Sequence, residues 1–176
     1  MKLLLKIALG FLALVVIIVI AAQENEEGVQ SALVSSDGTT VAPVSLRDRV
    51  AEVIYEKLDE KQFRGVSIEG DQLWVDFNVA ENLSASMTRR GAFSDAKDII
   101  EIVSTEAGFD SISVYHITGY FPLQDQYGNA KEEIVAQIEL TRDVAKKVNW
   151  DNMFAENFEN LVRAEGKLFL HAAFQR

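Results

Sequence analysis

The chain of 176 residues contains no cysteine. That absence excludes a disulfide framework, thiolate chemistry, zinc sites built on cysteine and a lipidated N-terminal cysteine. Histidine is also scarce: His116 and His171 lie far apart, and neither has a metal-ligating residue two or four positions away. The sequence therefore predicts no metal site and no cofactor, and His116 is interpreted as a structural residue of a strand.

Motifs typical of enzymes are missing as well. The chain has no glycine-rich phosphate loop and no G-x-S-x-G nucleophile turn. Carboxylates are plentiful, but no spacing marks an acid and base pair. We therefore predict a protein without catalytic residues, with a small hydrolase or inhibitor as the alternative.

Positive charge is in deficit, with 17 Lys and Arg residues against 27 Asp and Glu and a net charge of -10. Lys2 and Lys6 are the only charged residues among the first 22, so the remainder of the chain carries -12. A surface of this sign repels phosphate backbones, which argues against a nucleic-acid partner.

The N-terminus holds the longest apolar run, sixteen residues from Ile7 to Ala22. As a helix it would span roughly 24 Å, and Leu3 to Leu5 would extend it toward the ~30 Å thickness of the hydrocarbon layer. An uncleaved anchor and a signal peptide cleaved after Ala21 both fit. In either case the lysines precede the run and glutamates follow it, so the body is expected outside the cytoplasm, with residues 1–22 meeting the membrane.

Residues 23–44 have no basic or aromatic side chain and are rich in Ser, Thr, Glu and Gly. They are predicted to form a flexible stalk. Residues 45–176 are then a single extracytoplasmic domain of ordinary size, long enough to bury a core.

Periodicity predicts the elements of this domain. Ser45 and Asp48 form a capping box ahead of a helix reaching Leu58. A hairpin follows over residues 66–79, then a loop over 81–93 and a second helix from Ser94 to Gly108. Beyond it the pattern predicts strands over 111–123 and 133–140, a short helix over 143–148, a C-terminal helix from Phe154 that Gly166 ends, and an extended piece over 167–174.

The predicted fold class is α+β. In the simplest arrangement, two helix-hairpin units form one antiparallel four-stranded sheet with the helices packed on one face, followed by the C-terminal helix.

Two short stretches permit a binding role. Asp125-Gln-Tyr-Gly-Asn129 could surround calcium, but Asp125 is its only charged ligand, and Gly128 and Asn129 suit a hairpin turn. We predict the turn. Asn149-Trp-Asp-Asn152 is interpreted as a helix start in which Asp151 or Asn152 caps and Trp150 packs toward Phe154.

A candidate partner-binding face follows from strand alternation. The apolar residues of the second strand point toward the helices, so Trp74, Asp76 and Asn78 point away. Tyr115 is expected to join them from the third strand if Ile112 and Val114 point inward. The alternative is that the apolar C-terminal segment covers this face and makes Trp74 a core residue, and the apolar character of that segment favours the alternative.

Two resemblances add to this reading. The tail from Gly119 to Phe174, with YGN, NWDN and HAAF, resembles a segment of small exported or membrane-anchored proteins of bacteria and their phages, a largely uncharacterised family. The first half resembles the BON domain in its order of helix, hairpin, helix and strand. That likeness implies association with the envelope and with phospholipid, and no binding residue is carried over from it.

The sequence thus predicts a non-catalytic binding or accessory module at the cell envelope, tethered or secreted, with a protein as the expected partner. An envelope module of BON type that associates with phospholipid is the alternative.

Overall fold

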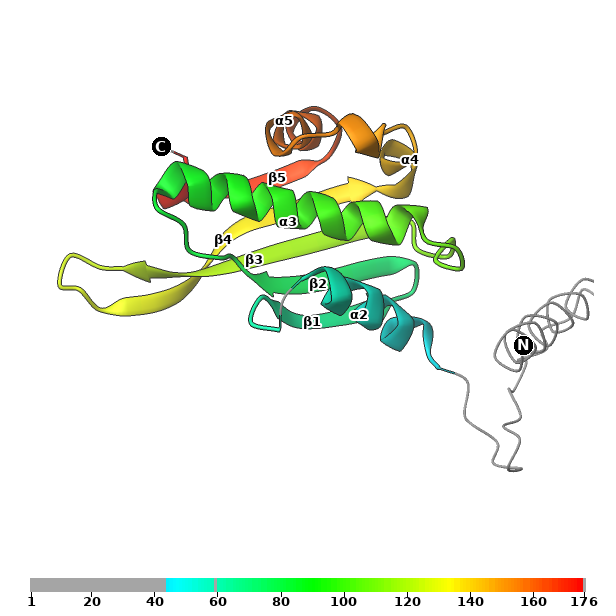
Figure 1. The fold of residues 1–176 in the computed structure, drawn as a ribbon, viewed down its shortest axis with the longest axis horizontal. Coiled ribbons are helices and arrows are strands. Elements are labelled where there is room, and N and C mark those ends of the chain that lie inside the picture. The colour runs from blue at the N-terminus through cyan, green and yellow to red at the C-terminus, as the bar shows by residue number, and fades with distance from the viewer. Residues whose placement is uncertain (1–43, 59, 176) are drawn as a thin grey trace, which may run out of the picture. The chain divides into compact units, whose positions relative to one another are not determined.

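The computed structural model describes residues 44–58 and 60–175, and Val44–Arg176 form one compact unit. The predicted anchor over 1–22 and nearly all of the predicted stalk over 23–44 lie outside the described residues. The elements follow in the order α2 (Leu46–Lys57), β1 (Phe63–Glu69), β2 (Gln72–Asn78), α3 (Ala85–Thr105), β3 (Val114–Gln124), β4 (Ala130–Thr141), α4 (Arg142–Ala145), η1 (Trp150–Asn152), α5 (Ala155–Glu165), β5 (Lys167–Leu170) and η2 (Ala172–Phe174) (Figure 1).

The strands form one five-stranded sheet in the order β1-β2-β3-β4-β5. The α+β class is confirmed, but the four-stranded antiparallel sheet is wrong. The strands β2 and β3 pair in parallel, from Gln72 opposite Val114 to Asn78 opposite Tyr120, while the other neighbours are antiparallel. The reason is α3, a 21-residue crossover that returns the chain to the end of the sheet where β2 begins.

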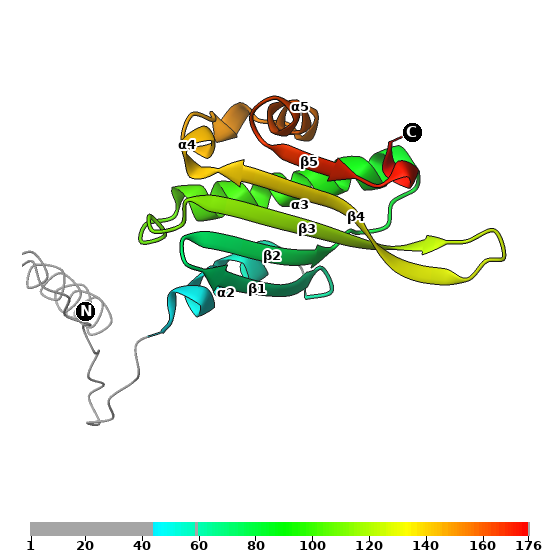
Figure 2. The ribbon, with the colours of Figure 1, turned by 180° about the vertical axis from the view of Figure 1, so that it is seen from behind.

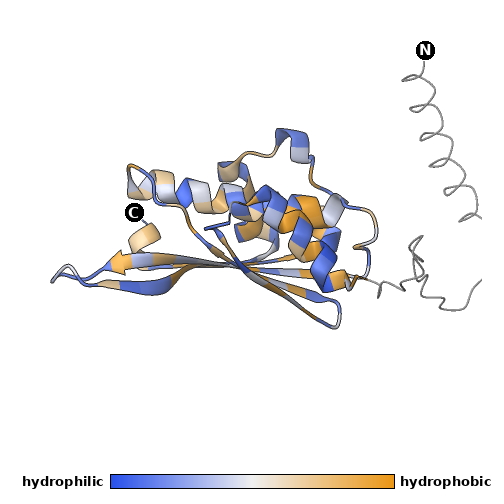
Figure 3. Cartoon of the chain, turned by 60° about the horizontal axis from the view of Figure 1, so that its bottom comes forward, coloured by the Kyte–Doolittle hydropathy of each residue, from blue (hydrophilic) through white to orange (hydrophobic). Residues whose placement is uncertain are grey.

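Helices α2, α3 and α5 all lie on one side of the sheet (Figure 3). Their apolar stripes pack with the alternate residues of the strands into a single core, whose fully buried members include Ile54, Leu73, Phe77, Phe93, Ile99, Ile100, Ile117 and Phe158. No described residue forms a layer on the opposite side, which Figure 2 shows from behind.

The first helix begins as predicted. The Ser45 side chain accepts a hydrogen bond from the backbone N–H of Asp48 at 3.1 Å, and the Asp48 carboxylate lies in the first turn, where the helix dipole favours negative charge. Val50 and Ile54, one turn apart, are fully buried.

The loop predicted over 81–93 is wrong, because α3 begins at Ala85, nine residues before the predicted start at Ser94. Ser84 is the cap, and its side chain accepts from the backbone N–H of Met87 at 3.2 Å. The polar surface residues and Gly91 hide the helical period, yet Thr88, Ala92 and Ala96 recur every four residues and are buried. Tertiary burial of this stripe overrides the weak local preference.

The hairpin between β3 and β4 extends past both of its neighbours in the sheet as a two-stranded arm (Figure 1). Its turn is the predicted one. The Asp125 carboxylate accepts hydrogen bonds from the backbone N–H groups of Tyr127 at 2.8 Å and Asn129 at 2.9 Å, and from the Asn129 side chain. Gly128 has φ +82, a conformation that glycine adopts without strain.

The C-terminal region differs from prediction in its helix start. Asp151 and Asn152 belong to the short helix η1, and α5 begins after Phe154 without a side-chain cap. Trp150 was predicted to pack toward Phe154, but it packs against Phe158, with ring centroids 6.4 Å apart. Phe154 itself is exposed, with 68% of its surface open to solvent. Gly166 ends the helix as expected, and Lys167–Leu170 adds a fifth strand along β4.

Among the residues that the structure describes, no helix has the length and apolar character needed to cross a membrane.

Candidate functional site

The uncovered side of the sheet presents two rows of side chains, each crossing from β2 to β5. We call this surface the open face, and register places its rows as Trp74, His116, Glu139 and Lys167, and Asp76, Thr118, Gln137 and Phe169. Strand alternation produces the rows, because the residues between them point into the core.

Three of the four predicted face residues lie where the alternation of β2 places them. Trp74, Asp76 and Asn78 are outward-facing, and Trp74 exposes 39% of its surface. The expectation that the C-terminal segment covers Trp74 is wrong: β5 joins the edge of the sheet, and α5 packs on the helical side. The apolar C-terminal residues are therefore buried without reaching the open face.

Tyr115 is not on the open face. It is fully buried on the helical side, because the parallel register pairs it with the inward-facing Leu73. His116 occupies the position beside Trp74 that was predicted for Tyr115. The alternation of polar His116 and Thr118 with apolar Tyr115 and Ile117 is the signal in the sequence that could have identified this arrangement.

Trp74 and His116 form a stacked pair with ring centroids 3.8 Å apart and planes inclined by 9°. His116 Nε2 lies 3.0 Å from Gln72 Oε1, and Nδ1 lies 3.8 Å from Glu139 Oε2. Partial burial lowers the pKa of His116; Glu139 opposes this effect and Lys167 reinforces it. The lowered pKa favours the neutral imidazole, which lies between Gln72 and Glu139.

Glu139 and Lys167 complete this row, with Lys167 Nζ 2.7 Å from Glu139 Oε1. Because the two charges are opposite and adjacent, the row has no net charge around neutral pH.

A hollow of about 300 Å³ lies between these two rows. Trp74 and His116 border it on one side and Phe169, 48% exposed, on the other. Thr118 and Gln137 lie between them, and within the described chain neither side chain has a hydrogen-bond partner. The hollow thus combines aromatic rings with two polar groups, the exposed amide of Gln137 and the hydroxyl of Thr118, whose residue is 8% exposed.

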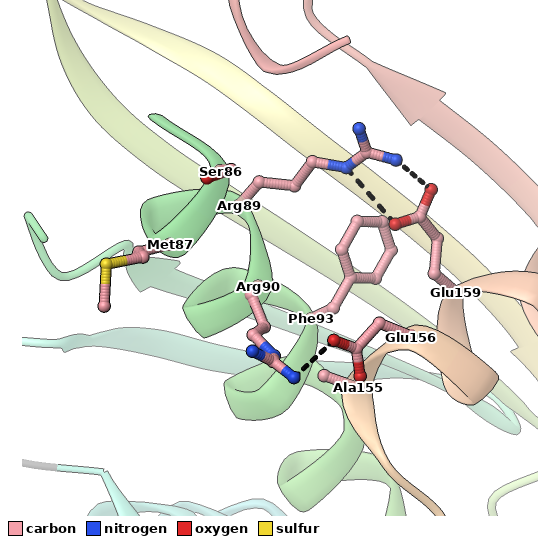
Figure 4. A pocket seen from close by; sticks show the side chains of 8 residues that line it. All are labelled: Ser86, Met87, Arg89, Arg90, Phe93, Ala155, Glu156 and Glu159. Carbon is pink, nitrogen blue, oxygen red and sulfur yellow. Dashed lines mark hydrogen bonds and ion pairs between the residues drawn. The ribbon is translucent and has the colours of Figure 1, made fainter. Parts of the chain in front are cut away.

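A second hollow, of about 290 Å³, lies where α3 and α5 begin (Figure 4). Glu159 accepts hydrogen bonds there from Arg89 Nε at 3.2 Å and Arg163 Nη2 at 2.7 Å, and Arg90 pairs with Glu156. Burial alone would raise the pKa of Glu159, but the bonds from Arg89 and Arg163 outweigh it and lower the pKa.

These ion pairs join α3 to α5. Arg89 and Arg90 fall within the segment 81–93 that was predicted as a loop, but both lie within α3 and are paired with glutamates of α5. Three exposed apolar residues lie at these helix starts: Leu83 at 96%, just before the α3 cap Ser84, Met87 at 49% in the first turn of α3, and Phe154 at 68%, just before α5. We call these three residues the helix-start cluster.

Across the described part of the chain, no three His, Asp or Glu side chains gather into a set that could hold a metal ion. Comparison of the chain with protein-family models, with curated proteins and with solved structures found no match. The resemblances to small exported phage and bacterial proteins and to BON domains therefore stay predictions.

Proposed function

We propose that this protein is a non-catalytic binding module at the cell envelope and that the open face is its binding surface. One observation carries the proposal: the stacked Trp74 and His116 and the exposed Phe169 border a hollow that no described residue covers. Exposed aromatic residues commonly supply much of the binding energy at recognition surfaces.

The contacts of His116 on the open face support a binding role rather than a catalytic one. His116 has Gln72 and Glu139 at its two ring nitrogens. Among the hydrogen bonds of the described residues, no serine or threonine hydroxyl contacts either histidine. Because no nucleophile among the described residues lies within reach of His116, its role is better explained as orienting its stacked neighbour Trp74.

The envelope location rests on the sequence. Lys2 and Lys6 precede the apolar run and acidic residues follow it, so the body is proposed to lie outside the cytoplasm. A reporter that is active only outside the cytoplasm, fused after Arg176, should be active. A reporter that is active only in the cytoplasm would contradict this part of the proposal, and mass spectrometry of the mature N-terminus separates anchor from cleaved signal.

Binding is tested with the immobilised full-length chain and an envelope extract of the source cells. The double variant Trp74→Ser and Phe169→Ser should lose the captured material. The control Tyr127→Ser removes an aromatic residue that is 79% exposed at the tip of the arm, and it should retain capture. Equal capture by wild type and double variant would refute the open face as the binding surface.

The helix-start cluster favours a second candidate function, association with phospholipid. Met87 and Phe154 are exposed apolar residues that line one hollow with Arg90, and the exposed Leu83 lies just before the cap of α3. This combination suits the boundary between acyl chains and headgroups. The net charge of -12 after Ala22 points to neutral rather than anionic lipid. Flotation with phosphatidylcholine vesicles should then depend on Leu83 and Phe154, tested by Ser substitutions. Flotation that survives these substitutions would count against this candidate.

A further inference from the structure

We infer that the hollow of the open face binds a neutral saccharide chain. This inference rests on the proposed function, since it names the ligand of the same surface. It depends on three features of the hollow: its balance of charge, its combination of aromatic rings with unpaired polar groups, and its length across the sheet.

The charge balance argues against an ionic ligand. Lys167 is paired with Glu139 at 2.7 Å, and the lowered pKa of the stacked His116 favours its neutral form. A phosphate or carboxylate ligand would need an uncompensated cation, and a cationic ligand an uncompensated carboxylate. Neither is present among the residues that line the hollow, and Asp76, the carboxylate at the β2 end of the second row, is not one of them. The fitting ligand is therefore uncharged.

The side chains offer two kinds of contact. Trp74 and Phe169 provide apolar ring surface, while Thr118 and Gln137 provide a hydroxyl and an amide without partners in the described chain. A pyranose ring has apolar C–H faces and hydroxyl groups around its rim, so it matches both kinds of contact at once. A purely apolar ligand would leave Thr118 and Gln137 desolvated and unpaired, which is costly.

The length of the site indicates a chain of sugars. The ring of Trp74 lies on β2 and that of Phe169 on β5, three strand intervals apart, or roughly 14 Å at the usual spacing between strands. This distance exceeds a single sugar ring. A ligand that contacts both aromatic residues must therefore comprise several linked units laid across the strands.

A protein partner fits the surface less well. A stable protein interface covers about 800 Å² on each side with an apolar centre. On the open face, Trp74 and Phe169 are the only large apolar side chains classed as exposed among the described residues. A peptide that extends a sheet would pair with an edge strand instead of a face.

Isothermal titration calorimetry of the full-length chain tests the inference. The probes are the neutral tetrasaccharides chitotetraose, cellotetraose and maltotetraose, with the matched monosaccharides as size controls. We expect at least one tetrasaccharide to bind, its monosaccharide to bind far more weakly, and the affinity to change little between low and high salt.

Variants place the binding site. Trp74→Ala and Phe169→Ala should each weaken tetrasaccharide binding by about tenfold or more, as for the loss of an aromatic hot spot. Gln137→Ala should weaken it without changing thermal stability, because the side chain is exposed and makes no internal hydrogen bond. Tyr127→Ala is the matched control and should bind as the wild type does.

Three outcomes would overturn the inference: no binding of any tetrasaccharide, binding that disappears at high salt, or binding unaffected by Trp74→Ala and Phe169→Ala. The proposed function is judged separately by capture from the envelope extract. Captured protein that depends on Trp74 and is not displaced by tetrasaccharide would refute the saccharide ligand while leaving the binding surface in place. If the chain neither captures material through Trp74 nor binds a tetrasaccharide, both the proposed function and the saccharide ligand are refuted.

Discussion

Arg142 is the residue whose replacement should most damage the frame of the open face. It is buried, with only 7% of its surface exposed, at the start of α4. Its Nη1 donates to the carbonyl oxygens of Phe109 at 2.6 Å and Ile112 at 3.3 Å, and Nη2 donates to the Asp110 carboxylate at 2.8 Å. These bonds hold the loop that leads from α3 into β3, and so they support the register that places His116 beside Trp74.

The magnitude follows from these contacts. Hydrogen bonds to a charged donor contribute about 1.5–3 kcal/mol each, so the two carbonyl bonds together contribute several kcal/mol. The buried Nε of Arg142 has no partner in the described chain, which offsets part of this gain. Asp110 contributes little, because its side chain is 78% exposed. We therefore expect Arg142→Met to lower the free energy of unfolding by about 3 kcal/mol.

The assay is urea denaturation of the full-length chain followed by circular dichroism, with the slope m compared between variants to verify two-state unfolding. Asp110→Asn is the control and should cost less than about 1 kcal/mol. A loss below about 1 kcal/mol for Arg142→Met, or an equal loss for Asp110→Asn, would show that the carbonyl contacts do not hold the loop.

Four further predictions use the same denaturation and melting assays. Trp74→Ala should cost about 1 kcal/mol, the value of a stacked aromatic pair, and a loss of about 3 kcal/mol or more would mean a core residue. Gly166→Ala should cost about 2 kcal/mol because its Cβ would collide with a backbone carbonyl oxygen of β4; Gly65→Ala, where a Cβ has nothing within 4 Å, is the control and should cost less. Millimolar calcium should leave the melting temperature unchanged because the Asp125 carboxylate already accepts three hydrogen bonds within its turn, and a rise of several degrees would contradict this. The pKa of Glu159 is lowered in the folded state, so its stabilisation is present above its unfolded pKa of about 4.3 and is lost as pH falls; Glu159→Gln should unfold more easily at pH 7 and lose this part of the acid dependence, and an unchanged pH profile would refute it.

Local patterns in the sequence determined those features that depend on neighbouring residues. Ser45 and Asp48 identify the start of α2, because a capping box is formed by residues three positions apart. Asp125 and Gly128 identify the turn of the arm in the same way. The alternation along β2 was sufficient to place Trp74 on the side away from the helices, since side chains of a strand alternate whatever strand lies beside it.

The neighbours of each strand were decided only by the tertiary structure. Strands joined by a hairpin and strands joined by a helical crossover show the same alternation of apolar and polar residues. This alternation therefore does not distinguish the parallel pairing of β2 with β3 from an antiparallel one. That pairing turns Tyr115 into the core and places His116 against Trp74. The early start of α3 and the docking of β5 on β4 likewise depend on burial against distant parts of the chain, which adds free energy that no local window of sequence contains.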